Sequence, residues 1–374
     1  MFIGVPKETK DQEYRVGLTP EAVGVLTQRG HEVCVERNAG TRIGFQDDAY
    51  RSAGAAIAAT PAEVYTAEFI VKVKELQAAE WPYLRPGQII FAYLHIAPDP
   101  ELAAVMLLKN VIGIAYETVT NATGGLPLLK PMSMIAGRLA IQVGAWGLQI
   151  ANGGNGTLLC GGPGITPGKV LVLGAGNAGS QAVAVAVGLG ANVTVLSHPS
   201  SRLSALAQTY GERIHTGALT QAAIAEVAAD ADLIVGAILK PGNLAPKLLT
   251  RKILRRMRPG SVLVDICIDQ GGLSVTSRPS SHSQPFYLDE GVVHYCVGNM
   301  PSAVALSSSQ ALVAATLPYV QAIADDGLAR ACYDDPGLQS GVQLYCGRVT
   351  HPGIARDLNL SYSPLDFAVT PGII

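Results

Sequence analysis

The sequence is poor in charged residues. Only 15% of its 374 residues are Asp, Glu, Lys or Arg, whereas 48% are hydrophobic. The formal net charge is -2, so no basic excess points to nucleic acid or to an anionic membrane surface as a partner. A soluble chain with so little charge is expected to bury part of its surface against copies of itself. The composition therefore favours a self-associating globular protein, and the length allows two domains.

Cysteines and long hydrophobic runs are also scarce. The six cysteines, at positions 34, 160, 267, 296, 332 and 346, are scattered, and none pairs at C-x-x-C or zinc-site spacing. Neither a disulfide framework nor a metal site is predicted, which favours a reducing cytoplasm. The longest apolar run, around Ala182 to Leu196, is interrupted by Gly188, Gly190 and Asn192. The N-terminal residues lack the apolar core of a signal peptide, so we expect a cytoplasmic protein without a membrane span.

Glycine is abundant, and one glycine-containing stretch carries the strongest motif. Residues 169–197 read as a strand, a glycine loop, a helix and a second strand, with Gly174, Gly176 and Gly179 at G-x-G-x-x-G spacing. In such a unit the first glycine permits a tight turn and the second lets the backbone approach a pyrophosphate. The third lets the helix pack closely on its strand. The stretch predicts a dinucleotide-binding βαβ unit, and the alternative is a glycine-rich turn without a ligand.

The rest of the chain alternates strands with helices, which predicts an α/β fold with largely parallel sheets. Further strands are expected at 2–6, 31–36, 69–74, 88–95, 111–116, 233–237, 261–269 and 292–296, and helices at 19–29, 61–66, 100–108 and 201–210. Two long helical stretches, 133–150 and 307–328, bracket the glycine-loop region, and Pro318 should kink or divide the second. We therefore expect two doubly wound, Rossmann-like domains. Residues 131–304 form a dinucleotide-binding domain inserted into a discontinuous domain of residues 1–130 and 305–374, in which the tail 361–374 is irregular.

Polar residues stand at the expected carboxyl ends of several strands, where open α/β sheets bind their ligands. Lys74 closes one strand, His95 the next and Asp269 a third, while Arg15 lies in the loop after the first strand. Arg15 and Lys74 could clamp a small carboxylate, and His95 and Asp269 could manage protons. Taken singly, each has an ordinary alternative. Arg15 could be a solvated loop residue, and Lys74 could lie with Lys72 on a solvent-exposed face of the strand. His95 could be a capping residue, and Asp269 could be a turn former.

Several longer segments resemble alanine dehydrogenase and its relative, the proton-translocating transhydrogenase. The matching segments are GVPKETKDQEYRVGLTP at 4–20, VKVKE at 71–75, YLHIA at 93–97, AYET at 115–118, PMSMIAGRLAIQVGA at 131–145, PGKVLVLGAGNAG at 167–179, DICIDQGG at 265–272 and HYCVGNMPSAV at 294–304. The resemblance implies reversible oxidative deamination of L-alanine to pyruvate and ammonium, with hydride transfer to a nicotinamide dinucleotide. It also implies a homohexamer.

The resemblance implies a role for each of the polar residues. Arg15 and Lys74 would bind the substrate carboxylate and carbonyl. His95 would be the general acid and base, and Asp269 would stabilise positive charge and assist proton transfer. Ser133 and Asn299 would line the nicotinamide pocket with Met300 beside it.

Two positions depart from the family pattern, and both concern the adenosine half of the cofactor. NAD-binding members have an acidic residue at the end of the second strand of the βαβ unit, where this chain has Ser197. Ser197, His198 and Arg202 could instead accept the 2′-phosphate of NADP, or a hydroxyl or water could serve the ribose of NAD. Leu219 stands where the family often has a serine. We therefore expect NAD as cofactor, with NADP as the alternative.

Two other functions remain open from the sequence. One is a transhydrogenase-like subunit that binds nucleotide without amino-acid turnover. The other is a non-catalytic paralogue whose altered cofactor site makes it a sensor or a structural protein. A dehydrogenase for another small L-amino acid is a variant of the leading interpretation.

Overall fold

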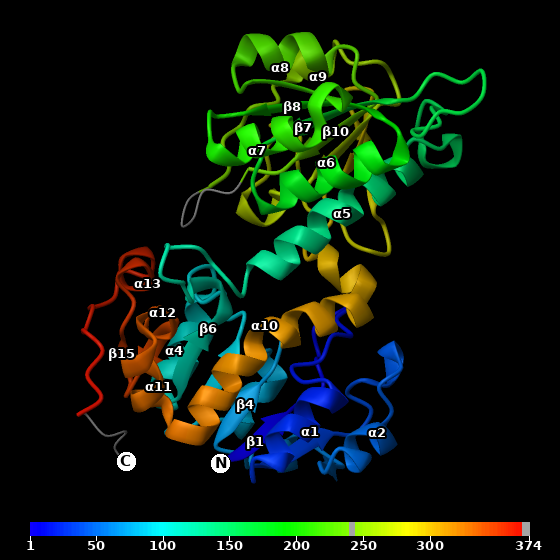
Figure 1. The fold of residues 1–374 in the computed structure, drawn as a ribbon. Coiled ribbons are helices and arrows are strands. Elements are labelled where there is room, and N and C mark those ends of the chain that lie inside the picture. Colours follow the sequence, from blue (N-terminus) through cyan, green and yellow to red (C-terminus); the bar gives the residue numbers. More distant parts are fainter. Residues whose placement is uncertain (239–243, 369–374) are drawn as a thin grey trace. The chain divides into compact units, whose positions relative to one another are not determined.

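A computed structural model describes residues 1–238 and 244–368 of the chain. The chain divides into two compact units (Figure 1). The first contains Met1–Met132 and the residues from Val304 onward, and the second is Ser133–Ala303. The first unit is thus discontinuous in sequence.

The first unit is built on an eight-stranded sheet with the order β15-β14-β6-β5-β4-β1-β2-β3. The strands are β1 (Phe2–Val5), β2 (Glu32–Glu36), β3 (Ala56–Ala58), β4 (Phe69–Val71), β5 (Ile89–Ala92), β6 (Ile112–Ala115), β14 (Val342–Tyr345) and β15 (Arg348–Val349). Strands β1 to β6 are parallel, while β14 runs antiparallel to β6 and to β15. Because β5, β4 and β1 are consecutive neighbours, the segments that leave their carboxyl ends emerge side by side.

Helices cover this sheet, and two of them begin with a side chain that caps the first turn. The helices are α1 (Pro20–Gln28), α2 (Asp47–Ser52), α3 (Pro61–Val64), α4 (Pro100–Leu108), α10 (Ala305–Asp326), α11 (Leu328–Asp334), α12 (Pro336–Gln339) and α13 (Pro352–Asp357). Thr19 accepts a hydrogen bond from the Ala22 N–H at the start of α1, and Asp99 accepts one from the Leu102 N–H at the start of α4. Residues of α4 and α13 pack with β4, β5 and β6 in one apolar cluster.

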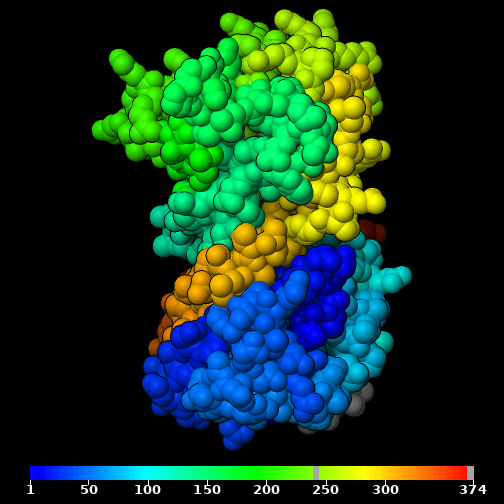
Figure 2. All heavy atoms as spheres, turned by 90° about the vertical axis from the view of Figure 1, so that its right-hand side faces the viewer, coloured from blue at the N-terminus to red at the C-terminus, as the bar shows by residue number. Residues whose placement is uncertain are grey.

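Helix α10 lies beside α1 in the first unit (Figures 1 and 2). The stretch Met300–Asp326 is long and apolar enough, by composition, to cross a membrane. Its contacts are those of a core helix: Ser309 Oγ accepts the Val16 N–H at 3.1 Å, and Asp325 binds Arg29 and His31. Pro318 lies inside α10, which remains a single helix of 22 residues. Of the two expected effects of Pro318, division of the helix was wrong, because packing along the helix outweighs one missing hydrogen bond, and a kink stays a prediction.

The second unit contains a seven-stranded sheet with the order β12-β13-β11-β10-β7-β8-β9. Its strands are β7 (Lys169–Leu173), β8 (Asn192–Ser197), β9 (Ile214–Ala218), β10 (Leu233–Gly236), β11 (Val262–Asp265), β12 (Phe286–Asp289) and β13 (Val292–Tyr295). All neighbours are parallel except the edge pair β12 and β13. Strand order reverses direction at β7, and the loop after β7 is the glycine loop.

Helices lie on both faces of the second sheet, as Figure 1 shows, with α8 and α9 on one side and α5 and α6 on the other. The helices are α5 (Lys130–Gly147), α6 (Asn177–Leu189), α7 (Ser201–Tyr210), α8 (Gln221–Ala228) and α9 (Arg251–Leu254). Side chains of α8 and α9 form one apolar cluster with β7, β10 and β11. The predicted fold class, two doubly wound α/β domains, is confirmed.

Sequence patterns misplaced the ends of three strands that carry polar site residues. Strand β4 ends at Val71, β5 at Ala92 and β11 at Asp265. Lys74, His95 and Asp269 therefore lie in the loops that follow, not at the ends of the strands themselves. Strands β3, β9, β12, β14 and β15 were not predicted, because they are short or lack a clear hydrophobic alternation. Residues 369–374 of the expected irregular tail lie outside the described residues, whereas Tyr362 pairs with Val349.

Candidate active site

The glycine loop has the geometry of a phosphate cradle. Gly174 has a φ of 106°, and a Cβ atom on it would lie 2.6 Å from the Ala237 carbonyl oxygen. A Cβ atom on Gly179 would lie 1.9 Å from the Gly174 carbonyl oxygen, so no side chain fits at either position. Helix α6 begins after Gly176, and no side chain caps its first turn. Backbone N–H groups of that turn can therefore bind an anion such as a pyrophosphate.

Ser197 and Leu219, the two departures from the family pattern, are neighbours in space. Ser197 is half-buried at the end of β8, and its carbonyl oxygen accepts the Leu219 N–H at 3.1 Å. Arg202, on the first turn of α7, approaches the glycine loop. Its Nη1 atom lies 3.9 Å from the position of a Cβ atom on Gly176. His198 is exposed between them in sequence, so this end of the site offers a hydroxyl, an imidazole and a guanidinium.

Asp269, Asn299 and Met300 come together at the ends of β11 and β13. Asp269 is exposed in the short 3₁₀ helix Ile268–Gln270, and its Oδ2 atom accepts the Asn299 N–H at 3.4 Å. A Cβ atom on Gly298 would lie 2.8 Å from Asp269 Oδ1, so the glycine admits the carboxylate. Asn299 has a φ of 56°, an unusual conformation that is common at functional sites, and Met300 is buried.

Ser133 lies on α5, close to the first turn of α6. Gly137 follows one helical turn later on the same face of α5. A Cβ atom on Gly137 would lie 2.0 Å from the Ala178 carbonyl oxygen. Ser133 therefore stands one turn away from the point where α5 touches the amino end of α6.

Arg15 is buried in the first unit and is held by one carboxylate. It is 2% exposed, and its Nε and Nη2 atoms donate to Glu13 Oε1 and Oε2 at 2.7 and 2.5 Å. Its Nη1 atom lies 3.1 Å from Met132 Sδ. Burial by itself lowers the pKa of Arg15, but the hydrogen bonds and charge of Glu13 raise that pKa above its ordinary value. Arg15 is thus a fixed, fully charged guanidinium and not a solvated loop residue.

Lys74 is also buried, at 7% exposure, and it pairs with the next residue along the chain. Its Nζ atom lies 3.4 Å from Glu75 Oε2, and Glu75 also binds Lys10. Burial raises the pKa of Glu75, but the charges of Lys74 and Lys10 outweigh it and lower that pKa to about 2. Lys72 is 0% exposed, so the alternative that Lys72 and Lys74 share a solvent-exposed face of the strand was wrong.

His95 is the third residue of the loop after β5, and its imidazole ring is exposed. The ring stacks on Tyr93, with centroids 6.1 Å apart and planes inclined by 16°. The Tyr93 hydroxyl donates to the Leu128 carbonyl oxygen at 2.7 Å, which fixes the ring beneath the imidazole. His95 has a φ of 45°, which is strained for a residue with a side chain.

Arg15, Lys74 and His95 all belong to the first unit and follow the adjacent parallel strands β1, β4 and β5, so they lie beyond the same edge of its sheet. A fixed guanidinium and an ammonium suit a small carboxylate, and an imidazole suits proton transfer near neutral pH. Sequence reasoning missed Glu13 and Glu75, the carboxylates that hold Arg15 and Lys74. Their closeness in sequence to the two cations was the available signal.

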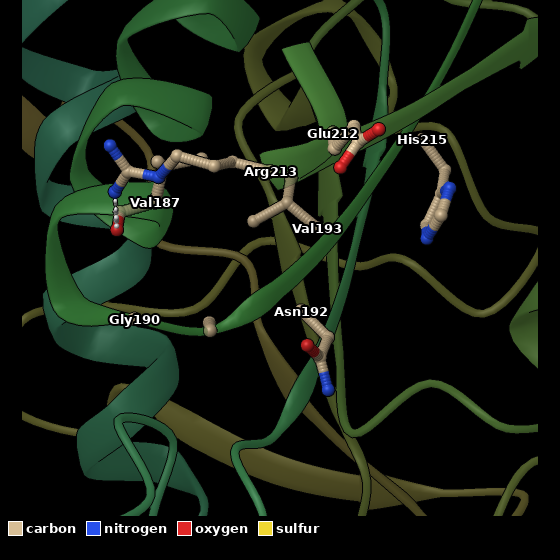
Figure 3. Close-up of a pocket in the computed structure, with 8 residues that line it drawn as sticks. Val187, Gly190, Asn192, Val193, Glu212, Arg213 and His215 are labelled. Carbon is tan, nitrogen blue, oxygen red and sulfur yellow. Dashed lines mark hydrogen bonds between the residues drawn. The ribbon is translucent and has the colours of Figure 1, made fainter. Parts of the chain in front are cut away.

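A pocket in the second unit lies away from the glycine loop (Figure 3). It is lined by the amino ends of β8 and β9 and the end of α6, including Asn192, Glu212 and His215. Arg213 at its edge donates from Nη2 to the Val187 carbonyl oxygen at 2.9 Å. Since the glycine loop is at the carboxyl end of β7, this hollow belongs to the opposite edge of the sheet. No group of three His, Cys, Asp or Glu side chains suited to a metal ion occurs within residues 1–238 and 244–368.

Comparison with known proteins places the chain in one family. The family profile described as alanine dehydrogenase/PNT, N-terminal domain, matches residues 4–136, and its C-terminal counterpart matches residues 140–352. A relative from Halomonas elongata named alanine dehydrogenase is 48% identical over 97% of this chain and 98% of its own. One of the same name from Bacillus subtilis is 46% identical over 99% of this chain and 98% of its own.

Two solved structures are also similar to this chain. One named L-alanine dehydrogenase superposes with a TM-score of 0.93 at 44% identity, covering 96% of this chain and 99% of its own. A transhydrogenase from Sinorhizobium meliloti superposes with a TM-score of 0.82 at 25% identity, covering 93% of this chain and 100% of its own. The chain belongs to the alanine dehydrogenase/PNT family.

Proposed function

We propose that this protein is an L-alanine dehydrogenase, which converts L-alanine and water to pyruvate and ammonium with hydride transfer to a nicotinamide dinucleotide, and catalyses the reverse reaction. The observation that carries the proposal is the similarity, over nearly the full length, to proteins named alanine dehydrogenase. The first unit would bind the substrate, and the second unit would bind the dinucleotide.

The reaction needs a fixed carboxylate clamp and a proton carrier. Arg15, held by Glu13, and Lys74, beside Glu75, would bind the substrate carboxylate and the developing carbonyl. A nicotinamide dinucleotide with its pyrophosphate at the glycine loop would supply the hydride acceptor. Arg15 and Lys74 orient the substrate, since hydride transfer depends on the position of Cα.

Proton transfer is assigned to His95 and Asp269. In the deamination direction, His95 would accept a proton from the water that adds to the imine, and would return it to the departing ammonia. Asp269, whose carboxylate is held beside the Asn299 N–H, would stabilise the positive charge on the imine nitrogen. Ser133, Asn299 and Met300 would line the nicotinamide pocket.

The glycine cradle fits a dinucleotide pyrophosphate, and the residues at the end of β8 bear on which dinucleotide is used. An acidic residue in place of Ser197 would bind the ribose hydroxyls of NAD and repel a 2′-phosphate. Here a hydroxyl and an imidazole follow β8, and Arg202 approaches the loop. We propose that NAD is the cofactor and that the site also accepts NADP.

The decisive experiment follows absorbance at 340 nm with pyruvate and ammonium, comparing NADH with NADPH. Glyoxylate and other 2-oxo acids extend the comparison to substrate range. Oxidation of the cofactor that requires both pyruvate and ammonium supports the proposal. Cofactor binding without turnover of any 2-oxo acid would instead favour a transhydrogenase-like nucleotide-binding subunit, and no binding at millimolar concentration would rule out the enzyme.

We further propose that the protein is a cytoplasmic homo-oligomer, with the hexamer implied by its resemblance to the family. The low charge content supports self-association, as do exposed apolar side chains of the second unit. These include Trp146, Ile150, Leu158, Ile165 and Leu288. Light scattering coupled to size-exclusion chromatography gives the mass, and a monomer would contradict the proposal.

A further inference from the structure

Glu8, in the segment after β1, binds the backbone that carries Lys74. Its Oε1 atom accepts the Val73 N–H at 2.6 Å and the Lys74 N–H at 3.3 Å. Glu8 is 6% exposed, so these hydrogen bonds are shielded from water. A buried carboxylate that accepts backbone N–H groups makes stronger bonds than a neutral acceptor. The chain leaving β4 is therefore fixed just where Lys74 begins.

A buried lysine holds Glu8 in turn. Lys72 Nζ lies 3.2 Å from Glu8 Oε2 and 3.2 Å from Glu80 Oε1. Burial alone lowers the pKa of Lys72, but the two carboxylates outweigh it and raise that pKa. The Tyr65 hydroxyl donates to Glu80 Oε1 at 2.7 Å, so Glu80 is itself held by a second buried side chain. Glu8 cannot turn away without leaving a buried ammonium short of a partner.

Glu117 binds the backbone that carries His95 in the same way. It follows β6, the next strand in the sheet, and accepts the Leu94 N–H at 3.2 Å and the His95 N–H at 2.8 Å. The φ of 45° at His95 is unfavourable unless neighbouring groups enforce it. The two hydrogen bonds from Glu117 supply such enforcement.

Asp265 does the same for the loop that carries Asp269 in the second unit. Its Oδ1 atom accepts the Cys267 N–H at 3.0 Å. Its Oδ2 atom accepts the Leu273 N–H at 2.6 Å and the Ser277 hydroxyl at 2.5 Å. Asp265 is 0% exposed and binds both ends of the loop that encloses Asp269.

We propose that Glu8, Glu117 and Asp265 are positioning residues, which hold the backbone of Lys74, His95 and Asp269 in place for the reaction. The inference rests on the proposed function, because that function makes these three loops the reacting ones. Each of the three loops leaves the carboxyl end of a strand and carries one of the residues assigned to the reaction. Reaction rates fall steeply when reacting groups move by about 1 Å, so a purely stabilising role would not account for the three locations.

The test compares two of the three residues with a carboxylate that makes similar contacts but accepts no N–H of Lys74 or His95. Glu8→Met is compared with Glu80→Met, because both variants leave Lys72 with one carboxylate beside the Glu75 carbonyl oxygen, and only the first removes the acceptor of the Lys74 N–H. Glu117→Gln is compared with Asp335→Asn, since Asp335 also accepts two backbone N–H groups, at 2.8 and 3.3 Å, but at the start of α12. Asp265→Asn is measured beside them. If Glu8→Met does not fold, Glu8→Met/Lys72→Met removes both buried charges together.

Two readouts separate positioning from stability. Hydrogen–deuterium exchange at 25 °C should be at least tenfold faster in the peptides that contain Lys74, His95 or Asp269 in the corresponding variant, and unchanged there in the controls. Steady-state kinetics should show a raised KM for pyruvate in Glu8→Met, and a kcat lowered at least tenfold with little change in KM in Glu117→Gln and Asp265→Asn. Melting temperature should fall in variants and controls alike.

Unchanged exchange and kinetics in the three variants would overturn the inference, as would kinetic losses of equal size in the controls. An inactive wild-type protein whose variants still show faster local exchange would overturn the proposed function, while supporting the assignment of the three carboxylates to these loops. An active wild-type protein whose three variants show unchanged exchange and unchanged kinetics would overturn the inference and leave the proposed function in place.

Discussion

At the scale of single residues, the charged groups of the candidate site are held by partners close to them in sequence. Glu13 binds Arg15 through two nitrogens, and Glu75 lies 3.4 Å from Lys74 Nζ. Such pairing limits the rotamers of two buried cations, and Glu13 raises the pKa of Arg15 against the effect of burial. His95 differs, because its ring is exposed and stacks on Tyr93. An exposed imidazole on a strained backbone suits a group that must exchange protons with water.

Replacing Lys74 or His95 with alanine should separate chemistry from cofactor binding. Loss of the imidazole in His95→Ala is expected to lower kcat by about 10²–10⁴-fold, the usual contribution of a general acid or base. Lys74→Ala should abolish measurable turnover, because the variant lacks the ammonium group that would bind the substrate. Both variants should bind NADH as the wild type does, measured by the change in nicotinamide fluorescence. Substantial turnover in either variant would remove its assigned role.

Ser197 is the residue that should decide cofactor preference. In Ser197→Asp the new carboxylate would accept hydrogen bonds from the ribose hydroxyls of NAD and repel a 2′-phosphate. We expect the ratio of kcat/KM for NADH to that for NADPH to rise at least about tenfold, which is roughly 1.4 kcal/mol of discrimination. Ser197→Asn is the uncharged control, and an unchanged ratio in Ser197→Asp would show that the phosphate contacts no group near β8.

At the scale of elements, the loops that leave the strands are shaped by side chains from elsewhere in the chain. After β4, the Lys72 N–H still donates to the Phe91 carbonyl oxygen, but the next N–H turns to Glu8. The ladder ends there because a carboxylate replaces the neighbouring strand as acceptor. After β5 the His95 N–H likewise donates to Glu117, and after β11 the Cys267 N–H donates to Asp265, the last residue of that strand. These strands are consequently shorter than their apolar sequences suggest.

Strand β13 contains a buried histidine whose titration should affect stability. His294 is 0% exposed, its Nδ1 atom donates to the Val292 carbonyl oxygen at 2.8 Å, and its Nε2 atom accepts the Thr276 hydroxyl at 2.7 Å. Burial lowers the pKa of His294, against the opposing effect of the Val292 carbonyl. The folded state therefore binds the proton less readily than the unfolded state, whose histidine pKa is about 6.5.

Stability from His294 should be fully present above about pH 6.5 and should be lost as the pH falls toward the lower folded-state pKa. Each unit of pKa lowering corresponds to about 1.4 kcal/mol of this loss. We expect the melting temperature of the wild type to fall between pH 7 and 5 more steeply than that of His294→Gln, whose side chain can hydrogen-bond but does not titrate. Scanning fluorimetry across that range measures the difference. Parallel curves would show that the buried imidazole contributes no pH dependence.

At the scale of the whole molecule, each compact unit has its own sheet and its own apolar cluster. The second unit is a continuous segment and contains the glycine loop, Ser197, Arg202, Asp269 and Asn299. The first unit contains Arg15, Lys74 and His95 and is made from two segments of the chain. The residues assigned to the proposed reaction are thus divided between the two units.

A fragment of residues 133–303 should fold and bind the dinucleotide without catalysing the reaction. Its own core cluster and uninterrupted chain favour independent folding, and it lacks Arg15, Lys74 and His95. Circular dichroism tests folding, NADH fluorescence tests binding, and the assay at 340 nm tests turnover. A fragment that folds but does not bind NADH would place essential cofactor contacts in the first unit.

The sequence alone determined the features that depend on local chemistry. Gly174, Gly176 and Gly179 predicted the cradle between β7 and α6, since the spacing of small residues is readable without the fold. The alternation of strands and helices predicted the fold class, and the types of Arg15, Lys74, His95 and Asp269 indicated carboxylate binding and proton transfer.

Only the tertiary structure decided which neighbours hold those residues. Glu8 lies 65 positions from Val73, and Glu117 lies 22 positions from His95, so no local pattern predicts either contact. Burial of Lys72, short strands such as β9 and the uninterrupted α10 likewise depend on packing between distant segments. Side-chain type is encoded locally, whereas the partners that fix a side chain in place arise only when the folded chain brings distant residues together.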